Sequence, residues 1–470
     1  MELGLIIALI ALSFLAAIRI SVNRYQKVIP NPSYKGFSIA NQDASLSQVV
    51  LSVLGTTLGG AITIGFIGLV YRSGTAFYIA GLSFLIGLTM LYATISKIRK
   101  QVAEGNITNF EQYIAGGNNW LLMLVSVVNI FAFIGLLASQ IISLKLILLI
   151  RFPQYSEWLF PAIILMVIIY TAMYGLMGIM ENDKVQLSAI MLWVGAIIFA
   201  LTSDFQGVSK ITALPQEMLN GLSMGIPFIV VVIIFLPWTA LARADYWQRI
   251  VAAKNDTDAK SAYGILIVTM FFMYSLFVLC GLYLAAITPG LDFNMAPFEI
   301  LKSLPKSFIT FAVVGIVAAL VSSADSFLNI STISIMSLVK GISREFGSGG
   351  KAGETEEDSK QGKMYRIYAV LVGISTYILV MLYDNLGVWV IMATSAVGLI
   401  VPSFVGNMIK PKGSKTPNIA SISSGIVIYA IALITDTIKP DEAFVYAILG
   451  ATIVYAATLY VFGKILHKES

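Results

Sequence analysis

The sequence predicts an all-helical membrane protein with about thirteen transmembrane helices, its N-terminus outside and its C-terminus inside the cell. Three observations lead to this fold class. Hydrophobic residues make up 58% of the 470 residues and charged residues only 12%, whereas soluble domains are about a quarter charged. The apolar residues gather in segments on the order of 20 residues long. Two of these segments contain helix-breaking residues at matching places in the chain.

The apolar segments that are long enough to cross a bilayer follow one another along the whole chain. They cover residues 3–20, 46–71, 75–97, 119–149, 158–180, 185–203, 224–245, 262–287, 307–338, 366–383, 386–408, 418–435 and 441–463. The first segment has Glu2 before it and Arg19, Arg24 and Lys27 after it. This is the pattern of an uncleaved helix with its N-terminus outside, rather than of a signal peptide.

The distribution of positive charge favours the same orientation. With the N-terminus outside, roughly three quarters of the 30 Lys and Arg residues fall in cytoplasmic connections, Arg243 and Arg249 among them. No Lys or Arg then lies at mid-membrane depth in the segments as drawn. We therefore expect no fixed side-chain cation for an acidic solute, although a helix N-terminus can bind a carboxylate without one.

The composition also excludes several classes of protein. The single cysteine, Cys280, excludes a disulfide framework within the chain, and the single histidine, His467, excludes a histidine metal cluster. The predicted spans contain no histidine that could pair with a nucleophile, so an intramembrane enzyme is not expected. Nothing in the sequence indicates a nucleic-acid partner or an obligate protein partner.

One span carries an unusual stripe of polar residues. Helical spacing places Ser322, Asp325, Ser326 and Asn329 on one face, with Ala319, Ser323 and Ser326 on the neighbouring stripe. Each such group is unfavourable in hydrocarbon unless it has a partner. Small oxygen-bearing side chains beside a carboxylate suit a small hard cation.

Two other spans contain residues that interrupt a transmembrane helix. In the second span, Gly55, Gly59 and Gly60 surround the segment 56–58, and glycine weakens a helix and permits close backbone approach. In the seventh, Pro237 removes a helical hydrogen bond. Ordinary glycine packing and a proline kink would explain each break alone. Paired at corresponding positions, and with the polar stripe, they favour an inverted-repeat transporter.

Four motifs resemble those of the sodium:solute symporter family, which includes the sodium/proline, sodium/galactose and sodium/sialic acid symporters. The resemblance covers about residues 40–465, and the motifs are residues 246–254 (YWQRIVAAK), 174–176 with 183–186 (YGL and DKVQ), 65–74 (GFIGLVYRSG) and 321–326 (VSSADS). The second motif departs from the family pattern, because Asn182 replaces a threonine and Leu176 replaces a glycine.

The resemblance implies the leucine-transporter fold of two five-helix inverted repeats. The expected organisation is a single transporter domain over 1–470, with a leading helix and cytoplasmic linker (1–45), a first repeat (46–203), a second repeat (224–408), a flexible cytoplasmic loop (341–365) and two peripheral C-terminal helices (416–470). It further implies a plasma-membrane or inner-membrane protein with several spans, for which the lipid bilayer and a small-molecule solute are the partners.

The resemblance also implies a sodium ion as the coupling ion. Its site would lie between the broken first core helix and the eighth core helix. The ligands carried over are the carbonyls of Gly55, Leu58 and Ala319 and the hydroxyls of Ser322 and Ser323. Carbonyls freed by helix unwinding would supply oxygens that a continuous helix keeps for itself.

Some members of the family have a further ion nearer the cytoplasm, and the matching positions here are Asp183, Ser322, Asp325 and Ser326. The functional interpretation is a second cation or proton site. The alternatives are that Asp325 pairs with a neighbouring Lys or Arg or is protonated, and that Asp183 lies at the cytoplasmic rim near Lys184.

The substrate is expected near mid-membrane, between the two breaks. The candidate side chains are Thr56, Thr57, Thr63, Tyr78, Asn129, Gln140, Trp238 and Thr239, with Trp389, Thr394 and Ser395 as candidates for an outer gate. Helix packing is the competing explanation for each. Thr57 stands where the family's proline symporters have an aspartate, which argues against proline. A small polar solute, neutral or zwitterionic, is expected.

The predicted function is therefore sodium-coupled import of a small organic solute by alternating access. Two alternatives stay open at this point. The first is a symporter of the same fold coupled to protons through Asp325 or Asp183. The second is a transporter-like receptor that binds a solute without moving it.

Overall fold

The computed structural model describes residues 34–346, 354–409, 415–435 and 440–466, and this part of the chain is helical apart from connections and one isolated bridge between Ala44 and Ala253. The predicted first span, 3–20, lies outside the described residues. Within the predicted linker, Tyr34–Ile39 form α2, which packs against α8 (Ser156–Ser203) and α16 (Glu354–Leu382).

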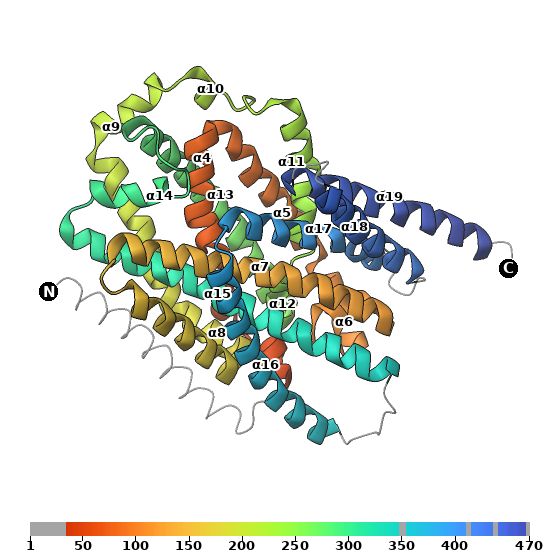
Figure 1. Cartoon of the computed structure of the whole chain (residues 1–470). Helices are drawn as coiled ribbons and strands as arrows, with labels where there is room; N and C mark the ends of the chain where they lie inside the picture. Colours follow the sequence, from red (N-terminus) through yellow and green to blue (C-terminus); the bar gives the residue numbers. More distant parts are fainter. Residues whose placement is uncertain (1–33, 347–353, 410–414, 436–439, 467–470) are drawn as a thin grey trace.

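Figure 1 shows how the helices are arranged, and those that overlap the predicted spans are given first. Their bounds are α3 (Leu46–Thr57), α4 (Ile67–Ser73), α5 (Tyr78–Gly105), α7 (Asn119–Arg151), α11 (Gly225–Leu241), α12 (Ala244–Ala252), α13 (Asp256–Ile287), α15 (Lys306–Phe346), α17 (Leu386–Ile409), α18 (Thr416–Thr435) and α19 (Pro440–Leu466). The short helices are η1 (Ala40–Gln42), η2 (Ala61–Phe66), η3 (Gly74–Phe77), α6 (Phe110–Ala115), α9 (Phe205–Ser209), η4 (Lys210–Ala213), α10 (Gln216–Leu219), α14 (Ala296–Glu299) and η5 (Ile300–Ser303).

Within the described residues, seven helices are long and apolar enough to cross a membrane, or up to eight if the bent pair α11 and α12 is one span. The protein is therefore a multi-pass membrane protein. Two of the seven stretches, 62–105 and 156–203, contain a glycine with positive φ, Gly74 and Gly175. The predicted total of about thirteen spans and the orientation of the termini stay predictions.

The 48-residue α8 is two helices that fold back on each other at Gly175, whose φ of 54° and ψ of −148° are not helical. Tyr170 before the break and Asp183 after it hydrogen-bond to Asp325 and Ser322, one turn apart on α15. In a straight helix the same two residues would be about 20 Å apart. The predicted division between 158–180 and 185–203 is therefore present, with its turn at Gly175.

α15 is the central helix of the bundle. It packs against α7, α8, α16 and α3, and its polar stripe is buried by these neighbours. The predicted flexible loop 341–365 is helical where it is described, since α15 continues to Phe346 and α16 begins at Glu354; residues 347–353 lie outside the described part. The C-terminal helices α18 and α19 pack against each other and against α17.

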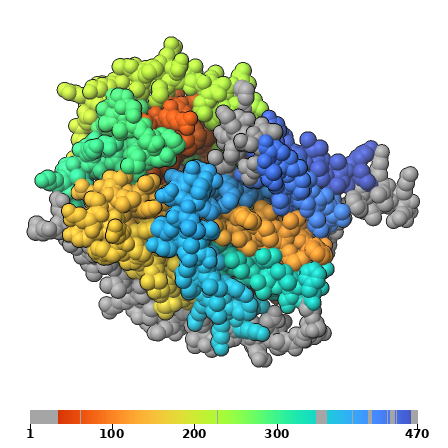
Figure 2. Space-filling model, in the orientation of Figure 1, coloured from red at the N-terminus to blue at the C-terminus, as the bar shows by residue number. Residues whose placement is uncertain are grey.

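The bundle has two ends, which we name by the elements that cover them. The α10 face carries η3, η4, α9 and α10, and Figure 2 shows the yellow-green segment around 204–224 spread over it at the top of the molecule. The α12 face carries α2, α6 and the C-terminal end of α12. The two broken helices, α3–η2–α4 and α11–α12, run between these faces.

Candidate functional site

The first core helix is broken where the glycines predicted it. α3 ends at Thr57, and the chain resumes as the π-type turn η2 from Ala61. At the break the Gly60 N–H donates to Gln140 Oε1 on α7 at 3.0 Å, instead of bonding a carbonyl in the preceding turn. The first hydrogen bonds of the new segment run from Ile62 and Thr63 to the Gly59 carbonyl. Gln140 therefore stabilises the break.

The hydroxyls of α15 face this break. Ser323 Oγ donates to the Thr56 carbonyl oxygen at 3.0 Å, which is the carbonyl left without Gly60 as donor. A Cβ at Gly59 would lie 1.7 Å from Ser323 Oγ, and a Cβ at Gly55 would lie 2.9 Å from Ser322 Oγ. Glycine at both positions is what lets α15 come this close. We call this region, Gly55 to Gly59 with Ser322 and Ser323, the α3–α15 contact.

The other two predicted sodium ligands are Leu58, within this contact, and Ala319, next to it on α15. Leu58 is fully buried at the break and its N–H bonds to the Leu54 carbonyl at 2.8 Å, while Ala319 is fully buried one turn before Ser322 and Ser323. The predicted ligands therefore come from the two helices that meet here, and they offer uncharged oxygens. Such a donor set fits a small hard cation.

The four residues of the predicted second site also meet. Ser322 Oγ donates to Asp183 Oδ1 at 2.6 Å, and Ser326 Oγ lies 3.2 Å from Asp325 Oδ1. Asp325 further accepts a short hydrogen bond from Tyr170 on α8. Asp183 is completely buried, so it is not a rim residue; its neighbour Lys184 pairs with Glu181 at 2.7 Å.

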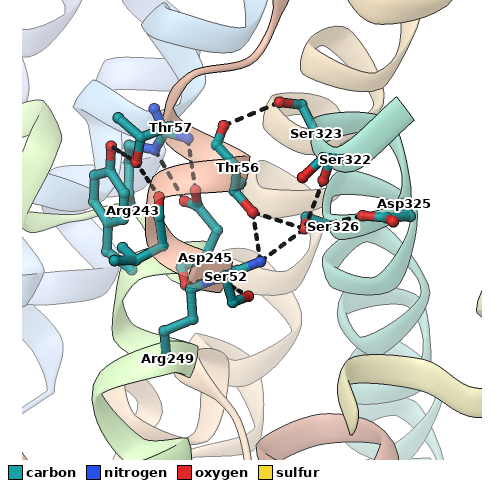
Figure 3. Close-up of polar contacts among 12 residues, drawn as sticks. Ser52, Thr56, Thr57, Arg243, Asp245, Arg249, Ser322, Ser323, Asp325 and Ser326 are labelled. Carbon is teal, nitrogen blue, oxygen red and sulfur yellow. Dashed lines mark hydrogen bonds and ion pairs between the residues drawn. The ribbon is translucent and has the colours of Figure 1, made fainter. Parts of the chain in front are cut away.

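A guanidinium that the sequence placed in the cytoplasm lies among these residues. Arg249 is fully buried, and its Nη2 donates to Thr56 Oγ1 at 2.6 Å and to Ser326 Oγ at 2.7 Å. Its Nε donates to Ser52 Oγ at 2.9 Å, and Nη2 lies 4.0 Å from Asp183 Oδ2. Figure 3 shows Arg249 reaching up between α3 and α15.

Arg243 was also assigned to a cytoplasmic connection, but it lies at the break in the seventh span, between α11 and α12. The seventh span does not end at residue 245: α11 stops at Leu241, and α12 continues from Ala244 at an angle of 42°. Arg243 therefore stands in the break, and Arg249 stands inside the second half of the span. Both guanidiniums lie inside the helical bundle beside the breaks, which the absence of Lys and Arg from the drawn segments did not predict.

Arg243 forms the base of a cavity of about 240 Å³. Its Nε and Nη2 make a bidentate pair with Asp245 at 2.9 Å and 2.6 Å, and its guanidinium lies 4.6 Å from the centre of the Tyr246 ring. The side chain of Arg243 is 17% exposed, whereas that of Asp245 is fully buried. In Figure 3 this pair lies across α3 from Ser322 and Asp325.

The cavity occupies the half of the bundle toward the α10 face. Its wall is mostly apolar and aromatic, and it comprises Ile62, Phe66, Leu69, Phe77, Ala80, Gly81, Phe84, Leu136, Leu236, Thr239, Tyr274, Val390, Ala393, Thr394 and Val397. Toward the α12 face the path is filled by α12, all of whose residues are buried. The cavity is therefore accessible from one side of the bundle.

Of the predicted substrate residues, Thr239 and Thr394 line this cavity. Thr56 and Thr57 lie below it, where Thr57 Oγ1 is 3.2 Å from Tyr246 Oη. Thr63 bonds the Gly59 carbonyl, and Gln140 stabilises the break.

The other candidates have separate contacts. Tyr78 Oη is 2.7 Å from Ser275 Oγ on α13, and Trp389 Nε1 donates to the Tyr383 carbonyl. Trp238 is partly buried against the core, and Ser395 is buried. Asn129 lies away from the breaks, where it donates to the buried carboxylate of Glu111 at 2.9 Å.

Three residues near the breaks were not predicted from the sequence to belong to the site: Arg243, Arg249 and Tyr170. A signal for the arginines was present, because Arg249 belongs to the motif at 246–254 and Arg243 follows a proline-interrupted span by only a few residues. A span drawn through the break to Ala252 would have enclosed both. Nothing in the sequence pattern singled out Tyr170.

Comparison with solved structures agrees with this architecture. A sodium-coupled sialic acid symporter, solved in a substrate-bound outward-open state, has a TM-score of 0.78 at 17% identity, over 98% of this chain and 97% of that chain. Mhp1, a nucleobase-cation-symport-1 family transporter, has a TM-score of 0.54 at 16% identity, over 93% and 96%.

MhsT, solved in complex with L-phenylalanine, has a TM-score of 0.50 at 16% identity, over 89% of this chain and 98% of that chain. The chain has the leucine-transporter fold. The resemblance found in the sequence is thus confirmed at the level of the fold, and the broken helices α3–η2–α4 and α11–α12 are the discontinuous helices of that fold. No family model and no curated protein matches the chain.

Proposed function

We propose that this protein is a sodium-coupled symporter that imports a small organic solute across the cell membrane. The observation that carries the proposal is the α3–α15 contact, where two serine hydroxyls face a helix break held open by Gln140. The two hydroxyls are bonded to Asp183 and to the Thr56 carbonyl, and with the backbone carbonyls at the break they offer uncharged oxygens, the ligands that suit a sodium ion.

In this proposal sodium is a transported substrate, bound by the carbonyls of Gly55, Leu58 and Ala319 and the hydroxyls of Ser322 and Ser323. The donor to the Thr56 carbonyl is Ser323, so the ion would compete with an existing hydrogen bond of 3.0 Å. The nearby Asp183 favours cation entry, since its Oδ2 is buried and has no hydrogen-bond partner among the described residues.

The predicted orientation puts the α10 face outside the cell. The cavity based on Arg243 would then open outward, while the Arg249 contacts with α3 and α15 hold the inner side closed. Inward release requires α12 and the first half of the broken helix to separate from α15, which breaks these contacts. The membrane potential contributes about 2.3 kcal/mol per charge per 100 mV to the drive.

The coupling between sodium binding and solute binding follows from thermodynamic linkage. Sodium at the α3–α15 contact and solute in the cavity share the break of the first core helix, and Thr57 of that helix touches Tyr246 beneath the cavity at 3.2 Å. If sodium raises the affinity for solute, solute must raise the affinity for sodium by the same factor.

Proton coupling is the second candidate, and one observation favours it. Asp183 and Asp325 are both buried near one guanidinium, that of Arg249. Two ionised carboxylates would leave one negative charge unbalanced, and either a proton or a second cation would neutralise it. The second-site prediction for Asp183, Ser322, Asp325 and Ser326 therefore stands as a proposal.

The experiment is a thermal-stability titration of the purified protein in nanodiscs with sodium chloride against choline chloride. Ligands that bind the folded state raise its stability with concentration. We expect sodium to stabilise the wild type and to have little effect on Ser322→Ala or Ser323→Ala. Ser331→Ala is the matched control, because Ser331 lies on the same helix and bonds only within it, to the Phe327 carbonyl. Equal stabilisation by choline would contradict sodium coupling.

A further inference from the structure

We infer that the cavity based on Arg243 is a carboxylate site, and that the transported solute is a small monocarboxylate with an apolar body. The inference rests on the proposed function in placing the solute in this cavity. It replaces the expectation of a neutral or zwitterionic polar solute.

The first support is the charge at the base of the cavity. Arg243 is the only Asp, Glu, Lys, Arg or His side chain among the described lining residues. Its Nε and one Nη2 hydrogen bind Asp245, while its Nη1 has no hydrogen-bond partner among the described residues. A guanidinium has five N–H donors, so an unused edge is left for a planar two-oxygen acceptor.

The second support is the fixed position of this guanidinium. Asp245 is fully buried below it, and the Tyr246 ring lies against it at 4.6 Å. The Phe327 ring is 6.0 Å away on another helix, α15. A donor held on three sides loses little conformational freedom when a ligand binds, which raises affinity.

The third support is the wall of the cavity, which determines what the solute can be apart from its carboxylate. Phe66, Phe77, Phe84 and Tyr274 surround it together with aliphatic side chains. The hydroxyls of Thr239 and Thr394 already donate to carbonyls within their own helices, at 2.7 Å and 2.8 Å. A polyol would leave many hydroxyls unpaired against this wall, which is unfavourable. An apolar chain or ring gains from burial there.

The absence of an acidic side chain from the described lining also argues against an ammonium group. The ammonium group of a zwitterion would depend on backbone carbonyls alone, because no acidic side chain is among the described lining residues and Asp245 is occupied on both oxygens beneath Arg243. A monoanion, in contrast, adds one negative charge next to a neutral ion pair. A sodium ion at the α3–α15 contact would balance that charge, so the two substrates would favour each other's binding electrostatically.

The test uses matched probes on the full-length protein in nanodiscs. The carboxylates are butyrate, hexanoate, benzoate and phenylacetate, each compared with its own amide, and L-phenylalanine serves as the zwitterion. We expect at least one carboxylate to bind the wild type at millimolar concentration or below, and its amide to bind at least about 30-fold more weakly.

The variant is R243Q/D245N, because Arg243→Gln alone would leave Asp245 buried without a partner. We expect the double variant to lose about 30-fold or more in carboxylate affinity and little in amide affinity. Sodium-dependent stabilisation should persist and reports that the variant is folded. The inference is overturned if no carboxylate binds, if an amide or L-phenylalanine binds as tightly as the best carboxylate, or if the double variant keeps its carboxylate affinity.

The two proposals fail separately in this experiment. Sodium stabilisation without any carboxylate preference would overturn the carboxylate site and leave the sodium site standing. Arg243-dependent carboxylate binding in a protein that sodium stabilises no more than choline does would overturn the sodium site and leave the carboxylate site standing.

Discussion

Arg243 and Arg249 are six residues apart on the same broken helix, yet their surroundings differ in almost every respect. Arg243 has one carboxylate partner, an aromatic ring beside it and a cavity in front of it. Arg249 is fully buried and binds hydroxyls from two other helices. The first guanidinium keeps donors for a ligand, and the second uses its donors to hold helices together.

This difference shows how one break can serve two purposes. Above it, toward the α10 face, the chain forms an apolar cavity with a single ion pair at the base. Below it, the four helices α3, α8, α12 and α15 are joined by a network of charged and hydroxyl groups, part of which Figure 3 shows. In the proposed transport cycle, opening toward the α12 face requires breaking that network, so the stability of the network would set the preference between the outward-open and inward-open states.

The largest expected effect is that of Arg249→Met. Removing one partner of a buried charge network costs about 3–5 kcal/mol, because Asp183 is left without a nearby cation. We expect a large fall in the thermal stability of the variant in nanodiscs. R243Q/D245N removes both members of its pair and should cost much less. Equal losses in the two variants would contradict the division of roles.

Gly59→Ala is expected to have the next largest effect. Its Cβ would lie 1.7 Å from Ser323 Oγ and 2.7 Å from Ser323 Cβ, so α3 and α15 must move apart, at about 1–3 kcal/mol. The sodium-dependent thermal shift should also weaken. Gly195→Ala is the control, since a Cβ there meets nothing within 4 Å. Adding Ser323→Gly to Gly59→Ala should recover stability but not the sodium response. If stability does not recover, the clash between residue 59 and Ser323 is not what destabilises Gly59→Ala.

A smaller effect is expected for Tyr246→Phe, which tests the link between the two regions. The hydroxyl lies 3.2 Å from Thr57 Oγ1, and one hydrogen bond contributes about 1 kcal/mol. We expect near-normal stability and a reduction of a few-fold in the factor by which sodium raises solute affinity. An unchanged factor, measured by solute titration with and without sodium, would show that coupling takes another path.

The smallest effect is expected at Glu111, a buried acid outside the spans whose hydrogen bonds come from the uncharged side chains of Asn129 and Ser334. Burial raises the pKa of Glu111, although Ser334 and Asn129 donate to it. The folded state then binds the proton more tightly than the unfolded state, so the free energy of unfolding falls as pH rises from about 4.3 toward the raised pKa. Glu111→Gln should flatten that slope in thermal melts across pH, and an unchanged slope would contradict it.

Much of this molecule could be predicted from the sequence, because the features concerned are local. Apolar segments give the spans, and the glycines around Thr56 and the proline at 237 mark the breaks. The helical spacing of Ser322, Asp325 and Ser326 correctly predicted that these side chains share one buried face.

The depth of the two arginines could not be obtained from the same rules. Charge tallies assign an arginine near the end of an apolar run to the water phase, which is correct for a continuous helix. Here α12 continues the span after a bend of 42° and is amphipathic, so its charged residues enter the protein interior. The partners of Arg249 come from positions near 52, 183 and 326, a tertiary arrangement that no local pattern encodes.

The most direct test of the sodium site is equilibrium binding of radioactive sodium to the purified protein, with Ser323→Ala and Ser331→Ala compared side by side. The wild type and Ser331→Ala should bind sodium saturably, with competition by unlabelled sodium but not by choline, and Ser323→Ala should lose this binding. Saturable binding that survives in Ser323→Ala, or no saturable binding in the wild type, would contradict a sodium site between α3 and α15.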